Sequence, residues 1–473
     1  MASLSKMKQY LVAKGLEKLL PALSDYSPGT LVHLIEKLKD NAIARMAANH
    51  TGDDYTLQKR IDASEGFFQM AKRKLPNLHP NTQRKLCYNL FFNTMHLGDE
   101  ARERYRARHG EYPPFFLTIS PSMACDLRCT GCYAWKYDKK ERLSFEEMDR
   151  ILTEAKEELG VYFVTLTGGE PTFYPELFPV VEKHGDIFFQ MYTHGQKIDK
   201  AMARRIAELG NLYPAISIEG GQEETDARRG AGAYQKVLDA MANLTEAGAL
   251  FGFSVTHTRW NHDAVCQGTF FDDMIAHGAA FGWFFQYIMY GKDPNPEMVP
   301  TAEQRYARLE AVWRFRREKP ILVFDFWNDG ESVLGCLAWG RKYVHITPSG
   351  YVEPCVFVHF AKDNIRDKGL VEILNSPVFK EARRRQPFTD DLRRPCPVID
   401  HPEQLKYLVE KYGLIATDGA SMAMIQDLYP VVCRQAEAYR AYLAQVDAEG
   451  VREGTHASSA CLCSMPSASS RVT

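Results

Sequence analysis

The chain has 473 residues, enough for two or three domains, and its 58 basic and 60 acidic residues leave a formal net charge of −2. This balance gives no electrostatic reason to expect a nucleic-acid partner. No apolar run approaches the roughly 20 residues of a membrane span, and the N-terminal residues lack the pattern of a secretory signal. Eleven cysteines in such a chain favour reduced thiols and metal ligands over disulfides, which predicts a cytoplasmic protein.

Residues 1–112 are predicted to be helical. Ser27 and Pro28 suit the N-cap and the first position of a helix. Apolar residues then recur at helical spacing, at Leu31, Leu34, Ile35, Leu38, Ala42 and Met46. We expect this stripe to pack within the protein, and its basic flank leaves a helix lying on a membrane surface as the alternative. Further helices are expected over 55–75 and 80–108.

A compact cysteine triplet follows the first strand candidate. Cys125, Cys129 and Cys132 are spaced C-x3-C-x2-C in the loop after residues 115–120. Three thiolates this close together can face one point, and such clusters select iron–sulfur centres or zinc. Zinc usually takes four ligands in separate C-x2-C pairs. A triplet with no fourth ligand nearby suits an iron–sulfur cubane with one open iron, and a structural zinc site is the alternative.

Strands and helices alternate from Pro113 to about Tyr290. The strand candidates are 115–120, 162–167, 187–193, 213–218, 250–256 and 282–289, and the helical periods are 144–159, 176–184, 199–209, 232–247 and 268–277. Ser144 and Glu147 form a plausible capping box. Repeated βα units predict a parallel sheet with right-handed crossovers, whose chemistry should lie at the carboxyl ends of the strands. A helix over 301–318 and a strand over 321–326 are expected next.

The motifs at these strand ends resemble those of the radical SAM superfamily. The triplet is followed by Tyr133, and one βα unit later Gly168, Gly169, Glu170 and Pro171 match the family's GGEP motif. The resemblance implies a partial (β/α)6 barrel with a [4Fe–4S] cluster on the three cysteines. It also implies S-adenosylmethionine (SAM) on the open iron, cleaved reductively to a 5′-deoxyadenosyl radical. The family often has an aromatic residue before the third cysteine; here that residue is a glycine, so Tyr133 is expected near the adenine.

Further contacts to SAM are implied at the ends of the next strands. The family's Ser-x-Asp-Gly turn and downstream Asp-x-x-Arg-Gly match Ser217, Glu219 and Arg229, with Glu in place of Asp. These residues, with the GGEP backbone and acid, are expected to position SAM, because arginine pairs carboxylates bidentately. A helix-start salt bridge is the alternative for Arg229. Thr193-His194-Gly195 is similar to the family's Thr-Asn-Gly, and His257 and Arg259 are pocket candidates only.

A second cysteine set lies further along the chain. Cys336, Gly350 and Cys355 are spaced C-x13-G-x4-C around a predicted hairpin, and Cys396 follows. A hairpin brings its ends together, so the cysteines can bind one cluster. The spacing resembles the opening of SPASM and twitch extensions, which hold auxiliary [4Fe–4S] clusters. The dense second block of a full SPASM pattern is absent, so one auxiliary cluster is expected, and a zinc knuckle is the alternative. The candidates for its fourth ligand are Cys433, Asp400, His401 or an open iron.

The predicted fold class is therefore α/β: a partial (β/α)6 TIM-like barrel with a helical N-terminal region and a small cysteine-bearing C-terminal auxiliary domain. The predicted divisions are 1–112 (N-terminal helices), 113–320 (radical SAM core), 321–400 (auxiliary iron–sulfur domain), 401–454 (C-terminal helices) and 455–473 (disordered tail). Cys461 and Cys463, in the tail, are not expected to be ligands.

The prediction for function is an enzyme that cleaves SAM and abstracts hydrogen from an unidentified substrate, with a ferredoxin or flavodoxin as reductant. Peptide modification leads by analogy with SPASM and twitch enzymes, although the first 112 residues show no winged-helix pattern to grip a leader peptide. Lipid or isoprenoid modification, with peripheral membrane contact, is suggested by the N-terminal helices and the aromatic run 281–290. A small-molecule cofactor precursor is the third option. The non-catalytic alternative is an iron–sulfur electron carrier or a zinc-stabilised scaffold.

Overall fold

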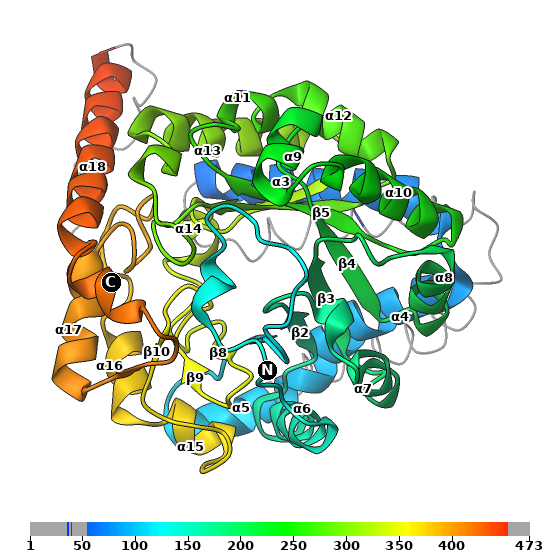
Figure 1. The fold of residues 1–473 in the computed structure, drawn as a ribbon, viewed down its shortest axis with the longest axis horizontal. Helices are drawn as coiled ribbons and strands as arrows, with labels where there is room; N and C mark the ends of the chain where they lie inside the picture. Colours follow the sequence, from blue (N-terminus) through cyan, green and yellow to red (C-terminus); the bar gives the residue numbers. More distant parts are fainter. Residues whose placement is uncertain (1–35, 37–38, 40–53, 453–473) are drawn as a thin grey trace, which may run out of the picture.

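The computed structural model describes residues 36, 39 and 54–452 (Figure 1). The tail 455–473 lies outside the described residues, as does the helix predicted to begin at Ser27 apart from residues 36 and 39. Within the described part of the chain, no helix is both long enough and apolar enough to cross a lipid bilayer.

A nine-stranded sheet organises the described residues, in the order β7-β6-β5-β4-β3-β2-β1-β8-β9. Its strands are β1 Leu117–Ile119, β2 Phe163–Leu166, β3 Phe188–Thr193, β4 Leu212–Ser217, β5 Gly252–His257, β6 Phe281–Gln286, β7 Leu322–Asp325, β8 His345–Ile346 and β9 Val352–Glu353. Neighbours from β7 to β8 pair in parallel, and β9 returns antiparallel to β8. A separate antiparallel pair joins β10 Phe360–Ala361 to β11 Ile415–Ala416. This mixed α/β architecture confirms the predicted fold class.

The helices follow the strands in βα units and surround the sheet. From residue 54 onward, those before β1 are α3 Asp54–Lys74, η2 Leu75–Asn77, α4 Pro80–Lys85, η3 Leu86–Leu97 and α5 Gly98–His109. Those between β1 and β7 are η4 Tyr133–Lys136, α6 Phe145–Leu159, η5 Pro171–Phe173, α7 Leu177–Lys183, α8 Lys200–Leu209, α9 Gln222–Arg229, α10 Ala233–Glu246, α11 His262–Val265, α12 Gly268–Ala276, η6 Pro296–Met298 and α13 Ala302–Glu318. The remainder are α14 Gly330–Val333, α15 Leu370–Leu374, α16 Pro377–Arg384, α17 Pro402–Tyr412, η7 Ser421–Ile425 and α18 Tyr429–Arg452.

The main core lies between the outer face of the sheet and these helices. Alternate strand residues such as Val164, Phe189 and Phe284 pack there against helix residues such as Ile151 of α6. The expected capping box begins α6: Glu147 N–H donates to Ser144 Oγ, and Ser144 N–H donates to the Glu147 carboxylate. The predicted helix therefore has both its apolar stripe and its start signal.

The N-terminal helices close the amino end of the barrel, behind the sheet in Figure 1. Their side chains donate to carbonyls ahead of three strands: Asn89 to Ile187 O before β3, Thr82 to Ala207 O in the last turn of α8 before β4, and Arg73 to Ala279 O before β6. Inward-facing rings such as Phe188 join the same apolar cluster. The described N-terminal helices therefore lie at the end of the barrel opposite the carboxyl ends of the strands.

Candidate functional site

The loop with the first cysteine triplet lies across the carboxyl ends of several strands, where it forms the cyan segment in front of the sheet in Figure 1. Backbone hydrogen bonds hold it there. Glu170 N–H, after β2, donates to Ala124 O at 2.8 Å, and Thr130 N–H donates to Arg228 O, after β4, at 3.0 Å. Lys292 N–H, after β6, donates to Cys132 O at 3.0 Å. Loops distant in sequence thus fix the position of the triplet.

The two glycines of the GGEP motif are required by this contact. A Cβ atom on Gly169 would overlap the carbonyl oxygens of Met123 and Ala124, and Gly168 has a φ of +115° and faces Ser122 O. Side chains would therefore push the cysteine loop away from the end of β2. The two glycines therefore allow the backbone after β2 to lie directly against the backbone of the cysteine loop.

The three cysteines lie close to one another, with two cations near Cys132. Cys125 is exposed, and Cys129 and Cys132 are half-buried. Burial, with the neighbouring Cys129, raises the pKa of the Cys132 thiol, and the nearby cations Arg228 and Lys139 act in the opposite direction. The net effect of the surroundings raises the pKa of Cys132, and that of Cys125 to about 11, so the free thiols stay protonated. The two cations would help to compensate the charge of thiolates bound to a cluster.

His194, at the end of β3, connects the triplet to the GGEP acid. Its Nδ1 accepts from Gln196 N–H at 3.0 Å, so its proton lies on Nε2 and is donated to the Asp126 carboxylate, also at 3.0 Å. Asp126 directly follows Cys125, and the Oε2 of Glu170 lies 3.4 Å from the same Nε2. From the sequence, His194 was noted only as part of a turn similar to the family's Thr-Asn-Gly, and its contact with Asp126 could not be predicted because it is made between separate loops.

Glu170 is almost completely buried, and the chain itself already supplies donors to its carboxylate. These donors are the N–H and O–H of Thr172, the O–H of Thr193 at 2.6 Å and the N–H of His194 at 2.8 Å. The geometry gives this acid an evident part in fixing the loops after β2 and β3. Contact with the amino group of SAM, expected from the motif, stays a prediction.

Glu219, at the end of β4, is a second buried carboxylate, 1% exposed. Its Oε1 pairs with Arg228 Nη1 at 2.5 Å and with Arg229 Nη2 at 2.5 Å, and its Oε2 accepts from Thr256 N–H. Both arginines lie in the last turn of α9, a helix that the sequence did not predict. Arg229 therefore forms a helix-end salt bridge in this structure, and its charge also lies near Cys129 and Cys132.

The other two predicted SAM contacts lie close to the same region. Ser217, on the inner face at the end of β4, has its Oγ 3.2 Å from Ser254 Oγ on β5. Tyr133 has its hydroxyl 3.2 Å from Thr167 Oγ1, and its ring packs edge-on against Phe357 with 5.2 Å between centroids. Tyr133 thus joins the triplet loop to the segment that carries the second cysteine set.

His257 and Arg259 have structural partners. His257 is fully buried, and its Nδ1 accepts from Arg308 at 2.7 Å, so its Nε2–H points to His262 Nδ1 at 2.8 Å. Cys266 completes a group with metal-ligand spacing, but the arginine donor leaves no lone pair on the Nε2 of His257 for a metal. Arg259 pairs with Glu297 at 2.8 Å on the surface.

The second cysteine set lines a single cavity of about 350 Å³. Cys336 and Cys355 are buried and Cys396 is half-buried, and the remaining wall is largely aromatic and apolar. Burial raises the pKa of Cys355 to about 12 and that of Cys396 to about 11. Tyr343 Oη lies 2.9 Å from Cys355 Sγ. Three thiol-bearing residues that line one pocket fit a soft metal cluster.

None of the three candidate fourth ligands lines this cavity. Asp400 accepts from Cys396 N–H at 3.0 Å and forms an ion pair with Arg305 at 2.5 Å. His401 Nε2 lies 3.0 Å from Arg394 O. Cys433 is on α18, outside the cavity wall. Asp400 therefore supports the cysteine backbone, and the described residues offer three thiols to the cavity.

A buried polar network between the two cysteine sets was not predicted. Glu353 Oε1 accepts from Tyr137 Oη at 2.7 Å, and its Oε2 lies 2.6 Å from His345 Nδ1. Because Tyr137 donates to the carboxylate, its oxygen accepts from His359 Nδ1, 2.5 Å away. The Nε2 of His359 has no hydrogen-bond partner among the described residues, and its ring stacks on Tyr290. Burial, with His345 nearby, holds the pKa of His359 well below its usual range.

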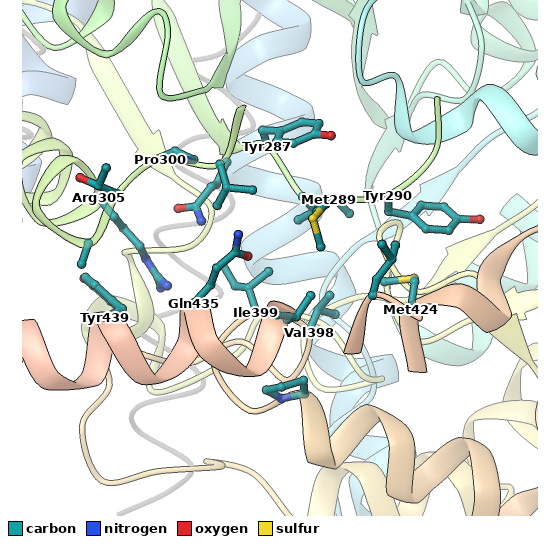
Figure 2. Close-up of a pocket in the computed structure, with 18 of the residues that line it drawn as sticks. Tyr287, Met289, Tyr290, Pro300, Arg305, Val398, Ile399, Met424, Gln435 and Tyr439 are labelled. Carbon is teal, nitrogen blue, oxygen red and sulfur yellow. The ribbon is translucent and has the colours of Figure 1, made fainter. Parts of the chain in front are cut away.

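A pocket lined by residues of several elements lies beside the triplet loop (Figure 2). Its volume is about 700 Å³, and its walls come from the end of β6, the start of α13, η7 and α18. Tyr287 and Met289 contribute from one side and Met424 and Tyr439 from the other. A Cβ atom on Gly131 would lie 2.5 Å from the Tyr287 ring, so one wall contacts the cysteine loop.

Comparison with known proteins identifies both regions. Residues 119–265 match the model of the Radical SAM superfamily, and residues 336–397 match the SPASM iron–sulfur cluster-binding domain. The mycofactocin maturase MftC of Mycobacterium tuberculosis (strain ATCC 25618 / H37Rv) is 30% identical over 301 residues, which are 58% of this chain and 73% of that protein. The PqqA peptide cyclase of Granulibacter bethesdensis is 27% identical over 316 residues, covering 62% and 81% of the two chains.

Solved structures agree on the fold. Streptococcus suis SuiB bound to S-adenosylmethionine superposes with a TM-score of 0.53 at 19% identity, over 63% of this chain and 76% of that one. SuiB bound to precursor peptide SuiA gives a TM-score of 0.52. The chain therefore belongs to the radical SAM superfamily, as an enzyme with a SPASM domain whose cofactors are SAM, its [4Fe–4S] cluster and an auxiliary cluster.

Proposed function

We propose that this enzyme modifies a peptide, and that its two cysteine sets hold the two clusters. Cys125, Cys129 and Cys132 would hold the cluster that binds SAM, and Cys336, Cys355 and Cys396 the auxiliary one. When bound, the first cluster and SAM supply a 5′-deoxyadenosyl radical. The observation that carries the proposal is the grouping of each cysteine set: the first three thiols lie close enough to shift one another's pKa, and the second three line one cavity.

The surrounding residues position these groups and shield them. Glu170 and Glu219 fix the loops after β2, β3 and β4, and through them the SAM side of the triplet. The ring of Phe357 packs against that of Tyr133 between the two cysteine sets, and we expect this contact to limit the access of water. The protein's own contribution is thus placement and exclusion of solvent, which is its usual share in cofactor enzymes.

The relatives support a peptide as the substrate class. The names of the PqqA peptide cyclase and of SuiB bound to precursor peptide SuiA refer to peptides, and the chain covers 81% and 74% of these proteins. The pocket beside the triplet loop has apolar walls with Gln286 and Gln435 among its polar groups, which suits side chains and amides of a peptide. A ferredoxin or flavodoxin would supply the electron.

The first test separates the two cysteine sets. After anaerobic reconstitution we expect about eight irons per chain, four for each cubane, and dithionite-driven conversion of SAM to 5′-deoxyadenosine. Cys129→Ala should abolish this conversion, whereas Cys355→Ala should retain part of it. Equal loss in both variants, with the fold preserved, would refute the division of roles. Zinc in place of iron, with no SAM cleavage, would refute the enzymatic assignment of the sites.

A second test addresses the substrate class. The reconstituted enzyme is incubated with SAM and the low-molecular-weight peptide fraction of source cells grown on deuterated medium. We expect deuterium to appear in 5′-deoxyadenosine, and to disappear when the fraction is first digested with a nonspecific protease. Deuterium transfer from the lipid extract of the same cells, with none from peptides, would overturn the peptide assignment.

A further inference from the structure

Two tryptophans in the wall of the auxiliary cavity have an indole N–H with no acceptor in the described part of the chain. Trp327 is 2% exposed and Trp339 is fully buried, and the Nε1 of each is shielded from solvent. Both line the cavity with the three cysteines. By contrast, the indole N–H of Trp283, in the barrel, donates to Gln190 Oε1 at 3.2 Å. The two buried indole N–H groups without an acceptor among the described residues thus both belong to tryptophans that line the cavity.

The neighbours of these two rings are aromatic. Trp327 packs against Phe357 at 4.8 Å and Phe326 at 5.0 Å between ring centroids, and Trp339 against Phe388 at 6.3 Å. Such rings fill space but provide no strong acceptor. A buried donor left unpaired costs free energy, and buried tryptophans usually find a partner for the N–H. Two unpaired donors in one wall indicate that the group filling the cavity accepts hydrogen bonds.

The backbone also holds Trp339 in an unusual conformation. Its φ is +66°, a left-handed conformation that bulky residues rarely adopt. Its own N–H donates to Pro354 O at 2.7 Å, next to Cys355. Backbone strain of this kind persists only where the surrounding structure fixes the conformation, and it is concentrated at functional sites. Trp339 is therefore held against the cysteine backbone, with its ring in the cavity wall.

We propose that the indole N–H groups of Trp327 and Trp339 donate hydrogen bonds to sulfur atoms of the auxiliary cluster. This inference rests on the proposed assignment of Cys336, Cys355 and Cys396 as ligands. Hydrogen bonds to cluster sulfurs are among the factors that set its reduction potential. Because the reduced cluster carries more negative charge, the two donors stabilise it and raise the potential. Tyr343, whose hydroxyl lies 2.9 Å from Cys355 Sγ, adds to the same effect.

The test measures the potential of the auxiliary cluster alone. The full chain carries Cys125→Ala, Cys129→Ala and Cys132→Ala together, is reconstituted anaerobically and is titrated by EPR. Trp327→Phe and Trp339→Phe keep an aromatic ring and remove the N–H. The matched control is Trp313→Phe on α13, outside the cavity, where Arg316 lies over the ring at 4.7 Å.

Each of the two substitutions should lower the ratio of reduced to oxidised cluster at a fixed potential by about tenfold, which is about 59 mV for one electron. The double variant should lower it by about the product of the two single effects, and the control should leave it unchanged. Unmoved potentials in both variants, with about four irons still bound, overturn this inference and leave the proposed function intact. No iron in the parent background overturns the auxiliary site itself and this inference with it.

A second readout applies if the phenylalanine variants lose the cluster. The parent protein is produced with indole-¹⁵N tryptophan, and the reduced cluster is examined by pulsed EPR. Hydrogen bonds from Trp327 and Trp339 to sulfur should give a resolved ¹⁵N coupling. A spectrum identical to that of the unlabelled protein overturns the inference without any substitution in the cavity.

Discussion

Replacing Glu219 by Gln tests the buried charge pairing beneath the triplet loop. The carboxylate and its two arginines are 1%, 12% and 11% exposed, so little solvent compensates the cations once the negative charge is removed. Breaking a buried ion pair from one side costs about 3–5 kcal/mol. The amide NH₂ of Gln would also face the Thr256 N–H, which now donates to Glu219 Oε2 at 3.1 Å. We therefore expect Glu219→Gln to lower the free energy of unfolding by about 3–5 kcal/mol.

The assay is urea unfolding of the cluster-free chain, so that cluster loss does not enter the measurement. The matched control is Glu297→Gln, which breaks the pair with Arg259 at 2.8 Å on the surface, where the two side chains are 70% and 37% exposed. That change should cost less than about 1 kcal/mol. Adding Arg228→Met to Glu219→Gln removes one of the unpaired cations and should recover part of the lost stability.

A loss below about 1 kcal/mol for Glu219→Gln would refute the reasoning, because it would mean that the two guanidinium groups find solvent or other partners. If adding Arg228→Met to Glu219→Gln recovers stability, the cost of Glu219→Gln comes from the unpaired cations and not from a packing defect. An equal loss in the presence and absence of Arg228 would assign the cost to packing around the carboxylate.

Three further predictions follow from the buried polar groups. His194→Leu removes the hydrogen bond to the loop after Cys125 and should speed iron release to a chelator by about tenfold, the equivalent of 1.4 kcal/mol. His194→Gln keeps a donor, so it should release iron nearly as slowly as the unaltered protein. Equal release rates in all three proteins would exclude this role for His194. The pKa values of His257 and His359 lie well below 6.5 in the folded chain, so only the unfolded chain gains their protons as pH falls, and stability should drop below pH 6.5 by about 1.4 kcal/mol per pH unit for each histidine. Urea midpoints between pH 7 and pH 5.5 should therefore fall less steeply in His359→Gln, and an unchanged slope would contradict the neutral assignment. Asp400→Asn leaves the Arg305 charge buried, and should lower both the thermal midpoint and the iron of the auxiliary site; unchanged iron would show that the ion pair does not hold the Cys396 segment.

Local sequence signals were sufficient for most elements of the barrel. Helix α6 has both its capping box and an apolar stripe, and α13 was expected over 301–318 and spans Ala302–Glu318. Strand 282–289 was predicted too long, since β6 ends at Gln286 and the following residues form a pocket wall. The aromatic run 281–290 keeps the residue composition of a strand beyond Gln286. Composition alone therefore does not show where the hydrogen bonding between β6 and its neighbours ends.

The partners of the motif residues could not be predicted from the sequence. The motifs correctly placed acids at the ends of β2 and β4, but Glu170 and Glu219 take their donors from loops after other strands. Helix α9 was missed because its sequence is almost entirely polar and offers no apolar stripe to the periodicity argument. Arg229 does form a salt bridge, but at the end of α9 and not at the helix start considered as the alternative. Its contact with SAM stays a prediction.

The second cysteine set is built into the barrel. Strand β8 pairs in parallel with β1, and a buried hydrogen bond of 2.7 Å joins His345 of β8 to Ser120. Residues of the hairpin, such as Ile346 and Val352, belong to the same core as the barrel strands. A shift of the hairpin by one residue would turn these side chains away from that core. The register of β8 against β1 therefore places the hairpin that leads to Cys355 beside the strand that leads to the triplet loop.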